Sequence, residues 1–220
     1  TTEIYTLSLH DALPIWIGRR SLEIPEDEYL YADINGKRIF YSLDTFFQAN
    51  LSILPRLMER IQSLAAFDST EVFFDLYAGV GLFGVYFADR AGAVVMIEEN
   101  IPSLKLMRYN LAKNGVARAD IFAGKVEEGL PVWMGAHPGR RKVGIIDPPR
   151  KGLSPEVCRA LSGEKRFDKL FYLSCNPESL VRDLGCFVRD GWEIARVIPF
   201  DFFPKTRHLE TLVFLRPPAR

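Results

Sequence analysis

The sequence predicts an α/β fold built on a doubly wound, mostly parallel sheet with an antiparallel edge strand. From residue 72 onward, short apolar segments of strand composition alternate with segments of helical periodicity. Alternation of this kind is typical of parallel sheets that are covered by helices on both faces. The last two strand-like segments, 192–199 and 209–215, have no helix between them, so we expect them to pair antiparallel.

A short β-hairpin is expected before the alternation begins. Asn35-Gly36 is a two-residue turn signal between the strand-like residues 29–33 and 37–41. Residues 51–66 then carry apolar side chains at helical spacing. The elements predicted to follow are strands at 72–76, 93–97, 119–123, 142–147 and 169–174, and helices at 83–89, 102–113, 154–162 and 178–188. Residues 124–141 are expected to form a long irregular loop.

The composition is that of a globular protein. A chain of 220 residues with 48% hydrophobic and 25% charged residues can bury one full core and carry a small appendage. No apolar run approaches the ~20 residues of a membrane-spanning helix, and we expect no membrane association. The 28 basic and 28 acidic residues cancel, so a nucleic-acid partner requires a local patch.

Three cysteines without CxxC spacing argue against a disulfide framework, a zinc site and an iron–sulphur cluster, and they favour a reducing cytoplasm. We therefore expect no metal. Cys158 and Cys186 are interpreted as small buried hydrophobes. Cys175 differs because it ends a predicted strand, and Asn176-Pro177 then begins a helix. A helix N-terminus stabilises a thiolate, so we expect a lowered pKa and a nucleophile at Cys175.

A glycine turn follows the predicted strand 72–76, in the segment from Tyr77 to Gly81. Gly79 and Gly81 allow the backbone to approach a ligand closely. Glu98 ends the next strand, where a carboxylate accepts hydrogen bonds from ribose hydroxyls. The turn and the acid together indicate a nucleotide-cofactor pocket. The alternative for Glu98 is a solvated strand end, and the adjoining Glu99 is expected to face solvent.

Two further groups are candidates for the same edge of the sheet. Asp147 is followed by Pro148-Pro149, a stiff strand exit that either holds the carboxylate over the ligand crevice or is a structural turn. Glu210 lies 35 residues after Cys175 and, in a strand, shares a face with His208. Spacing alone does not show whether this face meets Cys175. A set of basic residues forms either a phosphate-binding cluster or a solvated loop: Arg140, Arg141, Lys142, Arg150 and Lys151.

These motifs, in this order, resemble the S-adenosylmethionine-dependent RNA uracil-5-methyltransferases, which make 5-methyluridine in tRNA and 23S rRNA. The matching segments are 46–50, 75–84, 97–98, 110–115, 147–153, 174–177 and 203–210. The resemblance implies a Rossmann-like methyltransferase fold, S-adenosyl-L-methionine as cofactor, and an RNA partner whose target uridine is flipped out of its stack. We also expect a monomeric chain.

The resemblance also implies roles for individual residues. Cys175 matches the nucleophile that adds to carbon 6 of uracil, and Glu210 the base that removes the proton from carbon 5. The cofactor-binding positions are Gln48, Tyr77, Gly79, Gly81, Glu98 and Asp147. Phe46 matches a position that stacks on the base, and Arg150 a further position that contacts the substrate. Gln48 and Asp147 can contact the uracil edge instead of the cofactor.

Residues 1–15 look like a translated sequencing adapter, which predicts a non-native segment and a natural protein that begins earlier; a genuine leader is the alternative. Residues 16–43 are interpreted as the remnant of a preceding β-rich domain, and residues 44–220 as the catalytic domain. Two other functions stay open: an RNA cytosine-5-methyltransferase and a non-catalytic cofactor- or RNA-binding fragment. The sequence does not choose between tRNA and rRNA.

Overall fold

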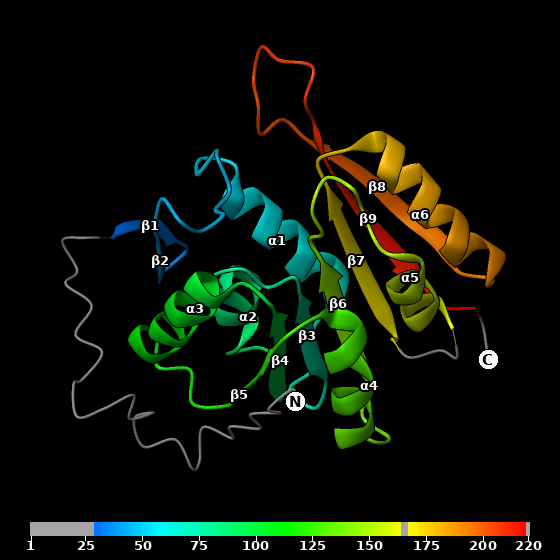
Figure 1. Ribbon diagram of the computed structural model, residues 1–220, viewed down its shortest axis with the longest axis horizontal. Helices are drawn as coiled ribbons and strands as arrows, with labels where there is room; N and C mark the ends of the chain where they lie inside the picture. Colours follow the sequence, from blue (N-terminus) through cyan, green and yellow to red (C-terminus); the bar gives the residue numbers. More distant parts are fainter. Residues whose placement is uncertain (1–28, 164–166, 219–220) are drawn as a thin grey trace.

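A seven-stranded sheet forms the centre of the molecule (Figure 1). The computed structural model describes residues 29–163 and 167–218, so the adapter-like residues 1–15 lie outside the described residues. The strand order is β5-β4-β3-β6-β7-β9-β8. The strands are β3 (Val72–Leu76), β4 (Ala93–Glu98), β5 (Ala119–Ala123), β6 (Lys142–Ile146), β7 (Lys169–Ser174), β8 (Glu193–Phe200) and β9 (Glu210–Arg216).

Strands β3 to β7 pair in parallel, which confirms the predicted doubly wound sheet. The antiparallel pairing at the end of the chain is also confirmed. The structure adds that β9 is inserted between β7 and β8 and runs antiparallel to both. The antiparallel strand at this edge of the sheet is therefore β8, and β9 lies next to β7.

Helices cover both faces of the sheet (Figure 1). They are α1 (Leu54–Ala65), α2 (Leu82–Phe87), α3 (Ile101–Lys113), α4 (Val126–Ala136), α5 (Pro155–Ser162) and α6 (Pro177–Arg189). The first three helices contribute to one apolar core and the last three to another. Successive side chains of a strand point to opposite faces, so Phe73 enters the first core and Phe74 the second. The longest helices among the described residues have 13 residues, and none is long and apolar enough to cross a membrane.

The predicted hairpin is present as β1 (Leu30–Ile34) and β2 (Lys37–Tyr41), which pair antiparallel outside the large sheet. Asn35 and Gly36 both have positive φ, as a tight two-residue turn requires. The hairpin lies against α2 and α3, and its inward residues Ile34 and Ile39 join the first core.

The prediction of an irregular loop over 124–141 is wrong, because α4 occupies much of it. Pro131 lies inside this helix and the segment is rich in glycine, which disfavours a helix in a local estimate. Tertiary burial outweighs these costs. Val126, Leu130 and Trp133 fall on one face of α4 and are buried in the second core.

Candidate active site

The site lies where the carboxyl ends of β3 and β6 meet. From β3 the chain winds outward through β4 to β5, and β6 then returns to pair with β3 on its other side. The direction of winding reverses at this point, and ligands of open α/β sheets bind in the crevice beyond the strand ends there. The segment 77–81 follows β3, and Asp147 follows β6, so the topology brings these two predicted elements together.

The segment from Tyr77 to Gly81 forms a tight loop, which we call the glycine loop. Tyr77, Gly79 and Gly81 all have positive φ. For Tyr77 this is a strained conformation, of the kind that surrounding structure maintains at ligand sites. A Cβ on Gly79 would meet nothing within 4 Å, so the backbone borders open space at this residue. A Cβ on Gly81 would lie 3.0 Å from Met107 Cγ, so this glycine permits close packing against α3.

Glu98 holds the glycine loop from the end of β4. Its Oε2 accepts a hydrogen bond from the Gly79 N–H at 2.8 Å, and its Oε1 accepts from the N–H groups of Glu99 and Asn100. The side chain is half-buried, whereas Glu99 is exposed as predicted. Glu98 is therefore more than a solvated strand end, because it connects the glycine loop with the start of α3.

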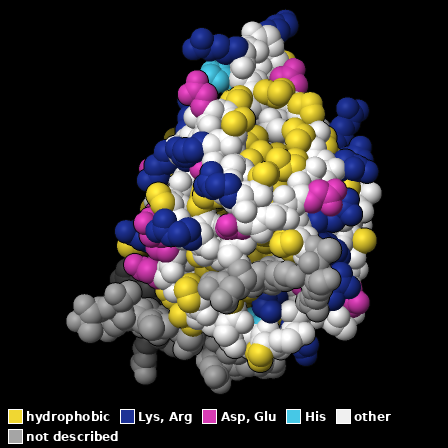
Figure 2. Space-filling view, turned by 90° about the vertical axis from the view of Figure 1, so that its right-hand side faces the viewer, with side chains coloured by type: hydrophobic (Ala, Val, Ile, Leu, Met, Phe, Trp, Pro, Cys, Tyr) yellow, Lys and Arg dark blue, Asp and Glu magenta, His cyan; other side chains and the backbone are white. Residues whose placement is uncertain are grey.

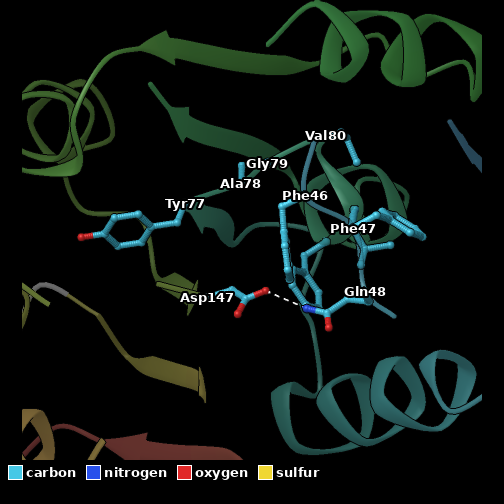
Figure 3. A pocket seen from close by; sticks show the side chains of 10 residues that line it. Phe46, Phe47, Gln48, Tyr77, Ala78, Gly79, Val80 and Asp147 are labelled. Carbon is cyan, nitrogen blue, oxygen red and sulfur yellow. Dashed lines mark hydrogen bonds between the residues drawn. The ribbon is translucent and has the colours of Figure 1, made fainter. Parts of the chain in front are cut away.

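A pocket opens beside the glycine loop (Figure 3). Phe46, Phe47, Gln48 and Asp147 line it together with residues of the loop and the start of α2. Gln48 is buried, and its Nε2 donates a hydrogen bond to Asp147 Oδ2 at 3.0 Å. The Phe46 ring lies beside this pair and is 71% exposed. An exposed aromatic ring next to two hydrogen-bonding side chains can stack on a planar ligand whose edge they contact.

The Tyr77 ring points away from the Gln48–Asp147 pair (Figure 3). The tyrosine is half-buried against the second core, and its burial raises the pKa of the phenol. Tyr77 therefore lines the pocket from the opposite side to Phe46 and Gln48.

Cys175 and Glu210 meet across β7 and β9. These strands pair antiparallel, and their last registered pair is Ser174 with Thr211. One step further along the same register places Cys175 opposite Glu210, at a spacing where directly opposed residues interact. The 34 residues between them, 176–209, include α6, β8 and a projecting loop, so the juxtaposition arises from the insertion of β9 beside β7.

The Glu210 carboxyl is buried, with 4% of the residue exposed. Removal from water raises its pKa to about 7, although the Arg150 guanidinium acts in the opposite direction. A carboxylate with this pKa is suited to accept a proton near neutral pH. The predicted alternation with His208 is wrong, because β9 begins at Glu210 and His208 lies in the exposed loop before it.

The expectation of a lowered pKa for Cys175 is also wrong. Cys175 directly follows β7, at the strand end as predicted, and Pro177 does begin α6. Burial nevertheless raises the pKa of the thiol, and the carboxyls of Glu210 and Asp147 raise it further. Arg150 opposes these effects through its charge and a hydrogen bond with the thiol. Proximity to a helix N-terminus does not outweigh two neighbouring acids in a partly dry site.

Asp147 connects the Cys175–Glu210 pair with the pocket. Its pKa is raised well above the ordinary value, first by burial of the carboxyl and then by the charges of Glu210 and Asp75. Asp75, the penultimate residue of β3, is fully buried, and burial raises its pKa to about 8. The burial of Asp147 and the charges of Glu210 and Asp75 thus favour the neutral form of the Asp147 carboxyl. Sequence reasoning gave no role to Asp75, although an acid within an apolar strand was a visible signal.

The five basic residues proposed as one phosphate-binding cluster do not form one. Arg140, Arg141 and Lys142 lie at the amino end of β6, whereas Arg150 and Lys151 follow its carboxyl end. Strand β6 begins at Lys142 and runs to Ile146, which separates the two groups by roughly 13 Å. The first group also has partners at the amino end: Arg140 donates to Thr70 O, and Arg141 pairs with Glu71. Only Arg150 and Lys151 lie on the side of the candidate site.

The loop that carries Arg150 is fastened to α6. Asn176 Nδ2 donates to Arg150 O at 3.0 Å, and Arg182 donates to Lys151 O at 2.7 Å. The buried Asp183 accepts from Leu153 N–H at 2.8 Å. The segment after Asp147 is therefore held by the helix that begins next to Cys175, which places Arg150 beside both Cys175 and Glu210.

The sequence model of the tRNA (uracil-5-)-methyltransferase family matches residues 22–217, nearly the whole chain. The chain belongs to this family. Family membership confirms the resemblance inferred from the ordered motifs.

Two curated relatives illustrate the extent of the similarity. An RNA methyltransferase of Thermotoga maritima is 36% identical over 170 residues, which cover 77% of this chain and 38% of that protein. One of Lactobacillus johnsonii is 37% identical over 175 residues, 79% of this chain and 38% of the relative. The chain therefore spans less than half the length of these family relatives.

Solved structures extend the comparison. The tRNA (uracil-54, C5)-methyltransferase of Pyrococcus abyssi, solved in complex with S-adenosyl-L-homocysteine, superposes with a TM-score of 0.71 and 28% identity, covering 86% of this chain and 44% of that one. A tRNA m1G37 methyltransferase of M. jannaschii superposes with a TM-score of 0.64 at 15% identity, covering 88% of this chain and 58% of that one, and shows the shared fold alone. The Rossmann-like methyltransferase fold is thereby confirmed.

Proposed function

We propose that this chain is the catalytic part of an S-adenosylmethionine-dependent RNA uracil-5-methyltransferase that acts through a covalent adduct at Cys175. The observation that carries the proposal is the register of β7 and β9, which sets Cys175 opposite Glu210 beside the pocket that contains Asp147. Family membership supports the reaction class. We also propose residues 44–220 as the catalytic unit, after a β-rich remnant over residues 16–43.

The residues around the pocket fit S-adenosylmethionine. Gly79 borders open space, Glu98 stands at the end of β4 where a ribose would be contacted, and Tyr77 and Gly81 complete the loop. The P. abyssi relative was solved with the demethylated form of this molecule. When bound, the cofactor supplies an electrophilic methyl group.

The chain's own residues perform the remaining chemistry. The Cys175 thiolate adds to carbon 6 of uracil, and the electron pair of the carbon 5–carbon 6 double bond moves toward oxygen 4. Carbon 5 becomes nucleophilic and accepts the methyl group. Glu210 then removes the carbon 5 proton, the double bond re-forms, and the carbon 6–sulfur bond breaks to release the Cys175 thiolate. Because the pKa of Cys175 is raised, we infer that the thiol gives up its proton to solvent when uracil is bound, so that Glu210 stays ionised to accept the carbon 5 proton.

Gln48 and Asp147 are proposed to contact the uracil edge. The raised pKa of Asp147 favours its neutral form, which can donate a hydrogen bond to an oxygen that gains negative charge. The Gln48 amide beside it is a second donor, and Phe46 supplies a stacking surface. Both faces of the ring must be reached, so the target uridine is proposed to be flipped out of its stack.

Exposed cations surround this opening. Arg150 and Lys151 are exposed beside Cys175, and the loop before Glu210 presents Lys205 and Arg207 to solvent. This loop projects above β8 and β9 (Figure 1), and Figure 2 shows basic side chains and a histidine at the tip of that face. We propose that these cations contact phosphates that flank the target uridine, with Arg150 nearest the reacting base.

A covalent trap tests the proposed function. RNA that contains 5-fluorouridine lacks the proton that Glu210 must remove, so incubation with S-adenosylmethionine should leave an adduct that survives denaturing electrophoresis. Cys175→Ala should form no adduct and lose roughly 10⁴- to 10⁶-fold in methyl transfer. Cys186→Ala is the matched control and should form the adduct normally.

The same assay separates the alternatives. An adduct on 5-fluorocytidine RNA but not on 5-fluorouridine RNA would indicate a cytosine-5-methyltransferase. Binding of S-adenosylhomocysteine without an adduct on any tRNA or rRNA transcript would indicate a non-catalytic fragment, and parallel assays with the two RNA classes identify the substrate.

A further inference from the structure

The motif from Asn110 to Gly115 has no part in the chemistry above, yet it carries a side chain that connects the N-terminal hairpin to the glycine loop. Asn110 is fully buried on α3. Its Oδ1 accepts a hydrogen bond from Phe40 N–H at 2.8 Å, and its Nδ2 donates to Phe40 O at 2.9 Å. The same Nδ2 donates its second hydrogen to Val80 O at 2.9 Å. One amide therefore holds a strand of the hairpin and the backbone of the pocket loop.

Asn114, one helical turn later, repeats half of this arrangement. Its Oδ1 accepts from Arg38 N–H at 3.0 Å, and its Nδ2 donates to Arg38 O at 2.7 Å. The remaining hydrogen goes to Asn110 O, within α3. Asn114 thus binds the hairpin as Asn110 does, but its side-chain hydrogen bonds go to Arg38 and Asn110 and none to the glycine loop.

The spacing of the two asparagines matches the strand that they bind. Residues four apart on a helix rise by about 6.0 Å, and residues two apart on a strand rise by about 6.8 Å. Arg38 and Phe40 are two apart on β2, and their backbone groups point away from β1 because these positions are not hydrogen-bonded to it. The two side-chain amides therefore take the place of a third strand beside β2.

Val80 occupies a sensitive position in the pocket. It lies between Gly79 and Gly81, both at positive φ, and it lines the pocket (Figure 3). The N–H of Gly79 is held by Glu98, and the N–H of Gly81 bonds to Ala78 O. The carbonyl of Val80 is held by Asn110. The peptide between Val80 and Gly81 is therefore fixed on its N–H side by Ala78 and on its carbonyl side by Asn110.

We propose that Asn110 is a positioning residue that makes cofactor affinity depend on the seated β1–β2 hairpin. The proposal rests on the proposed function, because it takes the glycine loop as the cofactor site. With the hairpin in place, Phe40 fixes the Asn110 amide, and the amide fixes the Val80 carbonyl. By linkage, cofactor bound at the glycine loop must stabilise the seated hairpin to the same degree.

Paired variants test the proposal. S-adenosylhomocysteine affinity is measured by isothermal titration calorimetry, and stability by thermal unfolding. Asn114→Ala should lower the melting temperature but leave the dissociation constant within about twofold. Asn110→Ala should lower the melting temperature and also weaken binding by about tenfold, the equivalent of roughly one buried hydrogen bond. The kcat of Asn110→Ala at saturating S-adenosylmethionine should stay close to normal, while its KM for the cofactor rises.

Equal affinities of the two variants and the wild-type chain would overturn the proposal and leave Asn110 a merely structural residue. Absence of binding in the wild-type chain itself would instead count against the proposed function. The hairpin has two further contacts, from Asn35 to the hydroxyl of Tyr86 on α2 at 3.0 Å and from Lys37 to Asp89 just after α2 at 2.5 Å. These contacts help both variants to keep the hairpin in place.

A measurement on the unmodified chain keeps the proposal testable even if Asn110→Ala does not fold. Hydrogen–deuterium exchange of the segment 38–41 is followed with and without S-adenosylhomocysteine. Binding should slow exchange there, although none of these residues lines the pocket. Unchanged exchange at saturating ligand would overturn the proposed coupling.

Discussion

Two buried glutamates at opposite ends of the sheet show how burial alone does not identify a functional acid. Glu71 precedes β3 at the amino end and is fully buried, but it pairs with Arg141 at 3.2 Å and with Lys169 at 3.1 Å. Glu210 begins β9 at the opposite end and is almost as buried, with a raised pKa that Arg150 only moderates. The difference lies in the partners: compensated charge stabilises the fold, and uncompensated charge is available for proton transfer.

Of the substitutions that test this comparison, the one at Glu210 should have the largest effect. Glu210→Gln keeps the size of the side chain but cannot accept the carbon 5 proton. We expect turnover to fall by roughly 10²- to 10⁴-fold, with methylated RNA accumulating as a stalled protein adduct. The stability of this variant should equal or exceed that of the wild type, because a desolvated acid is removed. Single-turnover kinetics and denaturing gels measure both outcomes, and unimpaired release of methylated RNA would remove Glu210 as the base.

The corresponding change at the amino end of the sheet, in Glu71, should lower stability and leave the chemistry unchanged. Glu71→Gln leaves Lys169 and Arg141 without their shared carboxylate, and we expect a loss of about 2 kcal/mol in the free energy of unfolding. Adduct formation below the melting transition should be unchanged, because the residue is remote from the pocket. Urea denaturation provides the stability value. A catalytic defect in Glu71→Gln at full folding would contradict the division between the two ends.

A third buried acid, Asp75, extends the comparison to the pH dependence of stability. Asp75 is the penultimate residue of β3, and burial raises its pKa from 3.8 to about 8. The folded state therefore binds a proton more tightly than the unfolded state, so this contribution to stability is complete below pH 3.8 and is lost as the pH rises toward 8. The slope reaches at most about 1.4 kcal/mol per pH unit.

Asp75→Asn should remove the part of the pH dependence of the unfolding free energy that comes from the proton on Asp75. Urea denaturation at pH 5, 6, 7 and 8 should give a flatter dependence of the unfolding free energy in the variant than in the wild type. Asp147 and Glu210, whose pKa values are also raised, contribute to the slope that remains. Parallel curves for the two proteins would show that Asp75 is already ionised in the folded state.

Local sequence patterns predicted most elements but failed where tertiary burial decides. The strand at 169–174 and the hairpin turn were predicted directly, because their apolar and turn residues act within a few positions. Helix α4 was missed, since Pro131 disfavours it locally while the buried face of Val126, Leu130 and Trp133 stabilises it. The basic residues were grouped wrongly for a related reason. Residues ten apart in sequence lie at opposite ends of β6.

The sequence by itself determined the alternating fold, the glycine turn, and, through the ordered motifs, the family and the identity of Cys175 and Glu210 as candidates. Only the tertiary structure decided that the two meet, because the position of β9 between β7 and β8 depends on pairing between distant segments. It also decided their protonation, since a pKa depends on which charges and how much water surround a group in space. The link from the hairpin through Asn110 to the glycine loop is also decided by the tertiary structure, because Asn110 lies 70 positions from Phe40 and 30 from Val80.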